Sequence, residues 1–380
     1  MARKPRQTPK QIEEIYDAGE NRLTQERNDF LLPQVQGFVR EQRWLNLRPE
    51  YQRRLVWDPG KKSRFMESLL MNIPIPPIFL FEYDLNRYEV MDGQQRLNTI
   101  LEFYENRLRL KGLQVWSALN GLTYDDCPPR IKRGFDRRRI SATVLLAENA
   151  KSVEDEQRIR RQVFERLNTG GQQLNAQELR NALYPGPLND LLKELAATRS
   201  FNEAWDIPPY KEHYLENGES ISEELANNRH FRRMLDCELI LRFAAFKRTS
   251  SIKGAVKTIL DNYMRDHQDA NGSVIDEVRN SFLESLELAC RIFGDGVFRI
   301  EGESGKCRVS TPLYDAVMVA TNGLRDRHED LINSRRAIQE ALLCALNDEE
   351  KYEVIVGRPN TAGAIKGRIA LVRELMSGCI

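Results

Sequence analysis

The chain has 380 residues, of which 41% are hydrophobic, and its 57 Lys and Arg against 56 Asp and Glu leave a net charge of +1. This length predicts more than one domain, and the apolar fraction suffices for a core, which excludes wholesale disorder. The near-zero net charge excludes a globally basic nucleic-acid binder, so any basic surface must be local.

Cysteine and histidine are dispersed along the chain. No two of the six cysteines lie within four residues of each other, and the four histidines form neither an HExxH motif nor a paired Cys/His spacing. We expect reduced, mostly structural thiols and no histidine-based metal site. The N-terminus lacks the apolar run of a secretion signal and no apolar stretch approaches about 18 residues, so we expect a cytoplasmic protein with no membrane partner.

The first half of the chain alternates between strand and helix signals. Residues 1–28 are polar and basic, and we expect a partly flexible N-terminal segment there. Asp58 is placed to cap a helix with Pro59 at its first position. The spacing of apolar residues then predicts strands over 78–83, 88–91 and 140–148 and a helix over 94–104, while residues 30–44 could hold a strand and a short helix.

Two further helices are expected before the pattern changes. Ser152 begins a helix that should end at Gly170 and Gly171, and Asn175 with Glu178 predicts a capping box for the next. Beyond residue 187 the periodicity is helical over 234–247, 255–266, 274–293, 312–326 and 334–348. The predicted fold class is therefore α+β, with a mixed α/β domain over 29–187 followed by an all-helical domain over 188–380.

One polar cluster, "DGQQR" over Asp92–Arg96, lies where a predicted strand passes into a helix. The first N–H groups of such a helix are free and attract anions such as phosphate, and Arg96 adds a charge with fork geometry. Gln94 and Gln95 could hold a water, a base edge or a ribose, and Asp92 could bind a metal or orient a water. The alternative is that Asp92 only caps the helix and the glutamines are solvated.

Two other polar clusters carry the same ambiguity. "EYQRR" over Glu50–Arg54 precedes an apolar run, and at most one of its two arginines is expected to face a site. "FERLNTGGQQLNAQELRNALYPG" over Phe164–Gly186 holds a double-glycine turn, which could wrap a phosphate with N–H groups or serve only as a helix end. No GxxxxGK[ST] motif is present, which excludes a P-loop NTPase by motif.

A basic run, "RIKRGFDRRRIS", follows over Arg130–Ser141. It places six Lys and Arg in twelve residues with a single Asp, the strongest local footprint for a nucleic-acid backbone. A solvated loop with salt bridges between elements is an equal alternative. The candidate DNA-binding residues are Arg130, Lys132, Arg133, Arg137, Arg138 and Arg139.

The three polar clusters, taken in this order, resemble the GmrSD N-terminal domain family of the ParB/sulfiredoxin-like superfamily, which includes the GmrS half of modification-dependent restriction enzymes. The resemblance is strong over residues 45–186. It implies a ParB/sulfiredoxin-like α/β domain that binds and hydrolyses an NTP (GTP, ATP or CTP), with Mg²⁺, and that regulates action on DNA. The implied catalytic residues are Asp92, Gln94, Gln95 and Arg96, with Asp92 also the metal ligand; the implied nucleotide-binding residues are Tyr51, Gln52, Arg53, Gly93, Asn168, Thr169 and Gly170.

Multi-domain members of that family add an HNH-type nuclease, which needs histidine-centred metal chemistry. Here His328 is the only histidine after His267, so we expect the nuclease to be a separate partner in a restriction or anti-phage defence system. Other expected partners are DNA, with or without modification, and a homo-oligomer is left open. Two alternative functions also remain: a sensor of modified DNA without turnover, and an autonomous ParB-like nuclease.

Overall fold

The computed structural model describes residues 8–10, 13–14, 24–47, 57–146, 153–167, 175–210, 222–301, 307–357 and 360–380. The chain forms two compact units, Met1–Leu174 and Asn175–Ile380. Each has its own hydrophobic core, one drawn from residues 32–146 and the other from residues 184–376. The sequence-based boundary at residue 187 lies twelve residues beyond the first residue of the second unit, Asn175.

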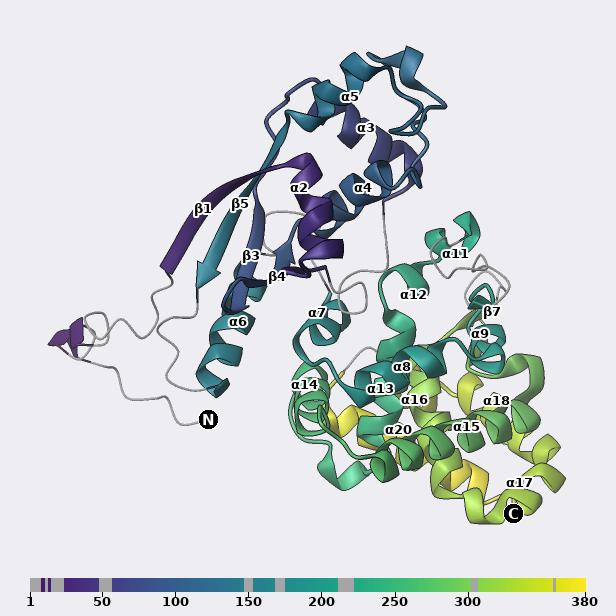
Figure 1. Cartoon of the computed structure of the whole chain (residues 1–380). Coiled ribbons are helices and arrows are strands. Elements are labelled where there is room, and N and C mark those ends of the chain that lie inside the picture. The colour runs from purple at the N-terminus through teal and green to yellow at the C-terminus, as the bar shows by residue number, and fades with distance from the viewer. Residues whose placement is uncertain are drawn as a thin grey trace. The chain divides into compact units, whose positions relative to one another are not determined.

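A five-stranded mixed sheet organises the first unit, in the order β1-β5-β3-β4-β2 (Figure 1). β5 pairs antiparallel with β1 and parallel with β3, and β4 pairs antiparallel with β3 and parallel with β2. The strands are β1 (Thr24–Leu31), β2 (Leu45–Asn46), β3 (Ile78–Asp84), β4 (Arg87–Asp92) and β5 (Arg139–Leu146).

Helices cover both faces of this sheet. Alternate strand residues such as Leu80, Val90 and Val144 join a core shared with the helices between β1 and β5. On the opposite face, Glu89 of β4 forms an ion pair with Arg160 of α6. The helical elements are α2 (Leu32–Gln36), the π-helix η1 (Gly37–Glu41), α3 (Pro59–Leu70), α4 (Gln94–Tyr104), the 3₁₀ helix η2 (Ser117–Leu119), α5 (Pro129–Asp136) and α6 (Val153–Leu167).

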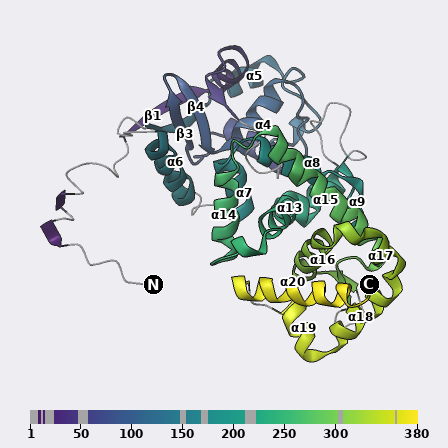
Figure 2. The same cartoon turned by 90° about the horizontal axis from the view of Figure 1, so that it is seen from below.

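Helices dominate the second unit, around the buried helices α13 and α16 (Figure 2). All nine residues from Leu313 to Thr321 of α16 are buried, as expected of a helix surrounded by other helices. The elements are α7 (Ala176–Leu183), α8 (Pro187–Ala196), α9 (Arg199–Ala204), α11 (Glu223–Asn227), α12 (Arg229–Arg232), α13 (Leu235–Phe246), η3 (Thr249–Ser251), α14 (Val256–Asp266), α15 (Gly272–Phe293), η4 (Gly294–Gly296), β6 (Arg299–Glu301), β7 (Cys307–Val309), α16 (Thr311–Gly323), η5 (Arg325–Arg327), α17 (His328–Asn333), α18 (Arg335–Asn347), α19 (Glu349–Val356) and α20 (Ala362–Ser377).

The predicted fold class, an α/β region followed by a helical region, is confirmed. The helical region also contains the short antiparallel pair β6 and β7, which is too short to show a strand period in the sequence. β1 begins at Thr24, inside the segment for which the sequence suggested only a basic, partly flexible chain. Among the described residues, no helix is both long and apolar enough to cross a bilayer.

Candidate functional site

The turn between β4 and α4 is built around Gly93. This residue has φ of 101°, a left-handed conformation that glycine adopts without steric cost. A Cβ atom at this position would lie 2.4 Å from Cγ2 of Ile78, so the close approach of β3 also requires glycine. The N-cap residue Gly93 supplies no side-chain cap to α4, and the leading N–H groups of a helix have no partner within the helix itself.

The two glutamines of this turn hold the chain on both sides of residues 48–56. The Gln94 Nε2 atom donates to the carbonyl oxygen of Leu47 over 2.8 Å, and the Gln95 Oε1 atom accepts from the backbone N–H of Trp57 over 3.4 Å. Gln94 is buried, whereas Gln95 is half-buried. The sequence suggested ligand contacts or solvent for these side chains; the structure gives both a backbone partner.

The side-chain amide nitrogen of Gln95 is a further feature of this turn. Its Nε2 atom is buried and has no hydrogen-bond partner among the residues that the structure describes. A buried amide donor without a partner is uncommon, because leaving it unsatisfied costs about 1–3 kcal/mol. The Gln95 amide is therefore a candidate donor to a ligand at the turn.

Arg96 stabilises the turn through contacts with Asp92 and with the chain that precedes β3. Its Nη2 atom lies 2.8 Å from Oδ2 of Asp92, and its Nη1 atom donates to the carbonyl oxygens of Pro76 and Pro77. Burial lowers the pKa of the Arg96 guanidinium and the Asp92 carboxylate opposes that shift, but an arginine remains charged in either case. The Nη1 atom thus joins α4 to the chain that enters β3, and the Nη2 atom joins α4 to the end of β4.

Asp92 differs from Arg96 in its exposure. Its side chain is 56% exposed while that of Arg96 is 11% exposed, so the carboxylate faces solvent beside the open end of α4. No group of three or more His, Cys, Asp or Glu that could hold a metal occurs among the described residues. A single carboxylate still fits Mg²⁺ that is bound mainly through nucleotide phosphates and waters.

Several predicted nucleotide-binding residues lie outside the described residues. These are Tyr51, Gln52, Arg53, Asn168, Thr169 and Gly170. The first three fall between Leu47 and Trp57, the two positions that the glutamines of α4 hold. The last three precede α7, whose own first turn is described.

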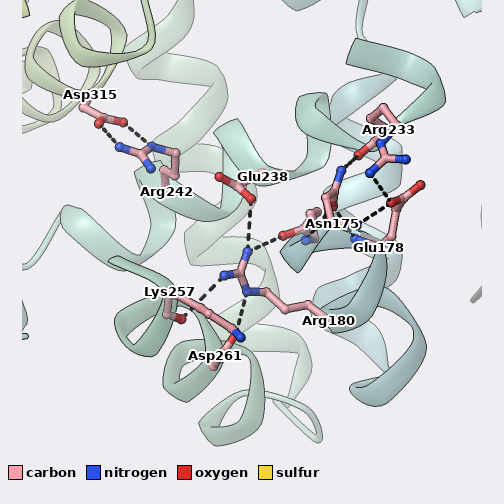
Figure 3. A network of polar contacts seen from close by, with 10 residues as sticks. Asn175, Glu178, Arg180, Arg233, Glu238, Arg242, Lys257, Asp261 and Asp315 are labelled. Carbon is pink, nitrogen blue, oxygen red and sulfur yellow. Dashed lines mark hydrogen bonds and ion pairs between the residues drawn. The ribbon is translucent and has the colours of Figure 1, made fainter. Parts of the chain in front are cut away.

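A network of buried polar contacts fixes α7 (Figure 3). Asn175 and Glu178 form the predicted capping box, which is confirmed. Arg180, only 2% exposed, donates from Nε to Oδ1 of Asp261 in α14 over 2.8 Å and from Nη1 to Oε2 of Glu238 in α13 over 3.2 Å. Glu178 also pairs with Arg233. These contacts attach the helix that follows residues 168–174 firmly to the second unit.

Two residues of the basic run bind other parts of the first unit, and four are exposed. Arg138 donates from Nη2 to the carbonyl oxygen of Leu70 over 2.8 Å, and Lys132 pairs with Asp125 over 3.1 Å. The remaining four candidates are exposed, and their guanidinium groups have no ion pair or hydrogen bond with any described residue: Arg130, Arg133, Arg137 and Arg139.

The residues that hold the turn in place include three that the sequence did not indicate: Trp57, Pro76 and Pro77. The carbonyl oxygens of Pro76 and Pro77 accept from Arg96. The available signal was the "IPIPP" stretch itself: a proline carbonyl remains an acceptor although its nitrogen donates nothing. Nothing in the sequence indicated that the backbone N–H of Trp57 would reach Gln95.

Comparisons with known proteins identify a family for residues 35–185. Among solved structures, one described as the C2221 form of a Pnob8-like ParB-N domain is 12% identical and covers 94% of this chain and 99% of its own, with a TM-score of 0.24; at this score the likeness carries no argument. No curated protein matches the chain. Residues 35–185 match the model of the GmrSD restriction endonuclease N-terminal domain. The resemblance drawn from the three polar clusters is thereby confirmed, and the chain carries a domain of the GmrSD N-terminal family.

Proposed function

We propose that this chain is a nucleotide-dependent regulator in a DNA-restriction or anti-phage defence system, and that a separate nuclease subunit cuts the DNA. The family match over residues 35–185 supports the restriction context. The observation that carries the nucleotide site is the β4–α4 turn, where a glycine in a left-handed conformation opens an uncapped helix end.

The turn offers the groups that a triphosphate needs. The N–H groups of the first turn of α4 and the positive end of the helix dipole favour phosphate oxygens. The exposed carboxylate of Asp92 is the ligand that we propose for Mg²⁺, which would neutralise phosphate charge. Which of GTP, ATP or CTP is preferred is left to the binding assay, because no base-reading group is described.

The roles of the other predicted site residues are refined by their contacts. Gln94 and Gln95 position the chain on both sides of residues 48–56. We therefore propose that they orient the segment carrying Tyr51, Gln52 and Arg53 toward the nucleotide, rather than act on water directly. Arg96 holds Asp92, and any phosphate contact by Arg96 would compete with the carbonyl oxygens of Pro76 and Pro77. Asn168, Thr169 and Gly170 are retained as phosphate-binding residues in the proposal.

Nucleotide binding and turnover test the proposal. Calorimetry and phosphate release should be measured with each of four NTPs and Mg²⁺, with and without DNA. Asp92→Asn keeps an acceptor for Arg96 but removes the charge, so turnover should fall at least tenfold while the melting temperature stays within about 2 °C. Asp125→Asn, which removes an exposed carboxylate elsewhere in the first unit, is the matched control and should retain turnover. A wild-type protein that neither binds nor hydrolyses any NTP contradicts the proposal.

The nuclease assignment has its own test. With a metal-supplemented wild-type protein alone, plasmid DNA should remain intact if a separate subunit performs cleavage. Nicking by the wild type that disappears in Asp92→Asn would instead favour an autonomous nuclease centred on the β4–α4 turn.

A further inference from the structure

The outward side of α5 carries an uninterrupted stripe of arginine. Arg130, Arg133 and Arg137 recur at intervals of three and four residues, which places them on one face of the helix and its C-terminal end. All three are exposed, and none of the guanidinium groups is paired with another described residue. We define these three residues as the arginine stripe.

Acidic charge in α5 is turned away from the stripe. Asp136, the only acid in the helix, accepts at Oδ1 from the hydroxyl groups of Tyr104 and Tyr124 over 3.1 and 2.8 Å. Burial, together with the hydrogen bond to Asp136, raises the pKa of the Tyr124 hydroxyl to about 12. The helix therefore keeps its carboxylate among tyrosines while its arginines face outward.

Of the other three basic residues in the run, Arg139 is exposed at the start of β5, whereas Lys132 and Arg138 form contacts within the first unit. Lys132 lies 3.1 Å from Asp125 and 5.1 Å from the centre of the Tyr124 ring. Arg138 donates to the carbonyl oxygen of Leu70 at the end of α3, and a Cβ at Gly134 would be 3.2 Å from Leu70 Cδ1. The helix is thus packed closely against α3, which holds the arginine stripe on a rigid support.

The geometry points to the phosphate backbone of duplex DNA as the partner of the arginine stripe. The three arginines span about 10 Å along the helix axis at 1.5 Å per residue. A duplex of that length carries about six phosphate charges, at one per 1.7 Å of axis. Guanidinium groups without protein partners suit such contacts, because a fork of N–H donors binds phosphate oxygens in pairs. This inference extends the proposed function, since it assigns the DNA-contacting surface separately from the nucleotide turn.

Salt-dependent DNA binding by the full chain tests the assignment. Fluorescence anisotropy with a labelled duplex should be followed across a NaCl series for wild type, for the triple variant R130Q/R133Q/R137Q, and for K132Q. If each arginine meets one phosphate, the triple variant should lower the magnitude of the log–log salt slope by about 2.7, at about 0.9 per phosphate. Its affinity at low salt should fall at least tenfold, while K132Q should stay within about twofold of wild type.

Controls separate this proposal from the nucleotide site and from other partners. The triple variant should keep the wild-type melting temperature and NTP binding, since no described residue forms an ion pair or hydrogen bond with the three guanidinium groups. The assignment is overturned if wild type binds no duplex, if the triple variant keeps the wild-type slope, or if K132Q loses as much as the triple variant. Retention of polyglutamate but not DNA by the stripe would also overturn it, in favour of an acidic protein partner.

Discussion

At the scale of single residues, Gly93 makes the sharpest demand on the sequence. Its φ of 101° and the 2.4 Å distance that would separate an added Cβ from Cγ2 of Ile78 both disfavour any residue other than glycine. We predict that Gly93→Ala lowers the free energy of unfolding of the first unit by at least ~2 kcal/mol, from backbone strain and overpacking. Urea titration of the variant and wild type measures this loss.

Gly112→Ala is the matched control for that substitution. Gly112 also has positive φ, of 70°, but an added Cβ would meet no atom within 4 Å. It should therefore lose only the cost of the backbone conformation, about 1 kcal/mol. Equal losses at the two positions would show that Ile78 adapts and that packing contributes nothing at Gly93.

Asp58 gives a residue-scale prediction that depends on pH. The backbone N–H of Lys61 at the start of α3 holds the pKa of the Asp58 carboxylate below its usual value. Because the folded pKa is depressed, the stabilisation by charged Asp58 is complete above the unfolded pKa of about 3.9 and disappears as pH falls through the lower folded value. Asp58→Ala should cost about 1 kcal/mol at pH 7, and progressively less below pH ~4.

Asp58→Asn is the comparison that isolates the charge. Asparagine is an equally good cap, so its contribution should not change between pH 7 and pH 3. Parallel thermal unfolding of the wild type and Asp58→Asn across that range measures the difference. Curves that keep a constant separation at every pH would contradict a charge-dependent cap.

At the scale of elements, sequence signals located most helices and strands but not the contacts between them. The helix over 94–104 was predicted with the bounds observed, because a glycine turn precedes it and apolar spacing defines its face. The sequence allowed a strand from residue 30 onward, but it did not indicate the first part of β1, because Thr24–Arg27 are exposed on an edge strand and show no alternation. Pro76, which accepts from Arg96, lies 20 residues away in the chain, and Asp261, which accepts from Arg180, lies 81 residues away. Local periodicity carries no information about such distant pairs.

The candidate site, like the fold, could be located from the sequence, but the contacts of its residues could not. The turn at Asp92–Arg96 was located as a candidate, but the sequence could not show that Asp92 is exposed while Arg96 is half-buried, because this difference depends on tertiary packing. In the basic run, the sequence could not separate Lys132 and Arg138, which have protein partners, from the arginine stripe. Helical spacing within the α5 segment would have indicated the stripe if the run had been assigned as a helix.

Arg180 carries the element-scale prediction. It is 2% exposed and joins α7 to carboxylates of α13 and α14. Arg180→Met would leave Glu238 and Asp261 without their shared cation, and removing one partner of a buried pair costs about 3–5 kcal/mol. We expect a loss in the lower part of that range, because both carboxylates retain some exposure. Thermal unfolding of the second unit measures it.

Arg199→Met is a matched control for Arg180→Met. Arg199 pairs with Glu203 on the surface, where the two side chains are 77% and 60% exposed, so the pair contributes about 0–1 kcal/mol. If Arg180→Met proved as mild as Arg199→Met, the network in Figure 3 would add little to stability.

At the scale of the whole molecule, the two separate cores predict two units of cooperative unfolding. A substitution that disturbs one core should leave the other intact, since each unit buries its own apolar surface. Gly93→Ala perturbs the first core beside Ile78. Asp315→Asn perturbs the second core, because the Arg242 side chain, which is only 5% exposed, would lose the charged carboxylate of Asp315, which is 0% exposed.

Hydrogen exchange at low urea, read by mass spectrometry of peptides, distinguishes the two responses. Gly93→Ala should raise exchange in peptides from the first unit, with residues 175–380 protected as in the wild type. Asp315→Asn should do the reverse, and the double variant should show both changes with additive losses within about 0.5 kcal/mol. Faster exchange throughout the chain in either single variant would mean that the two cores unfold as one cooperative unit. In that case the stability of the β4–α4 turn would depend on the helical unit, and the first unit produced alone should fail to fold.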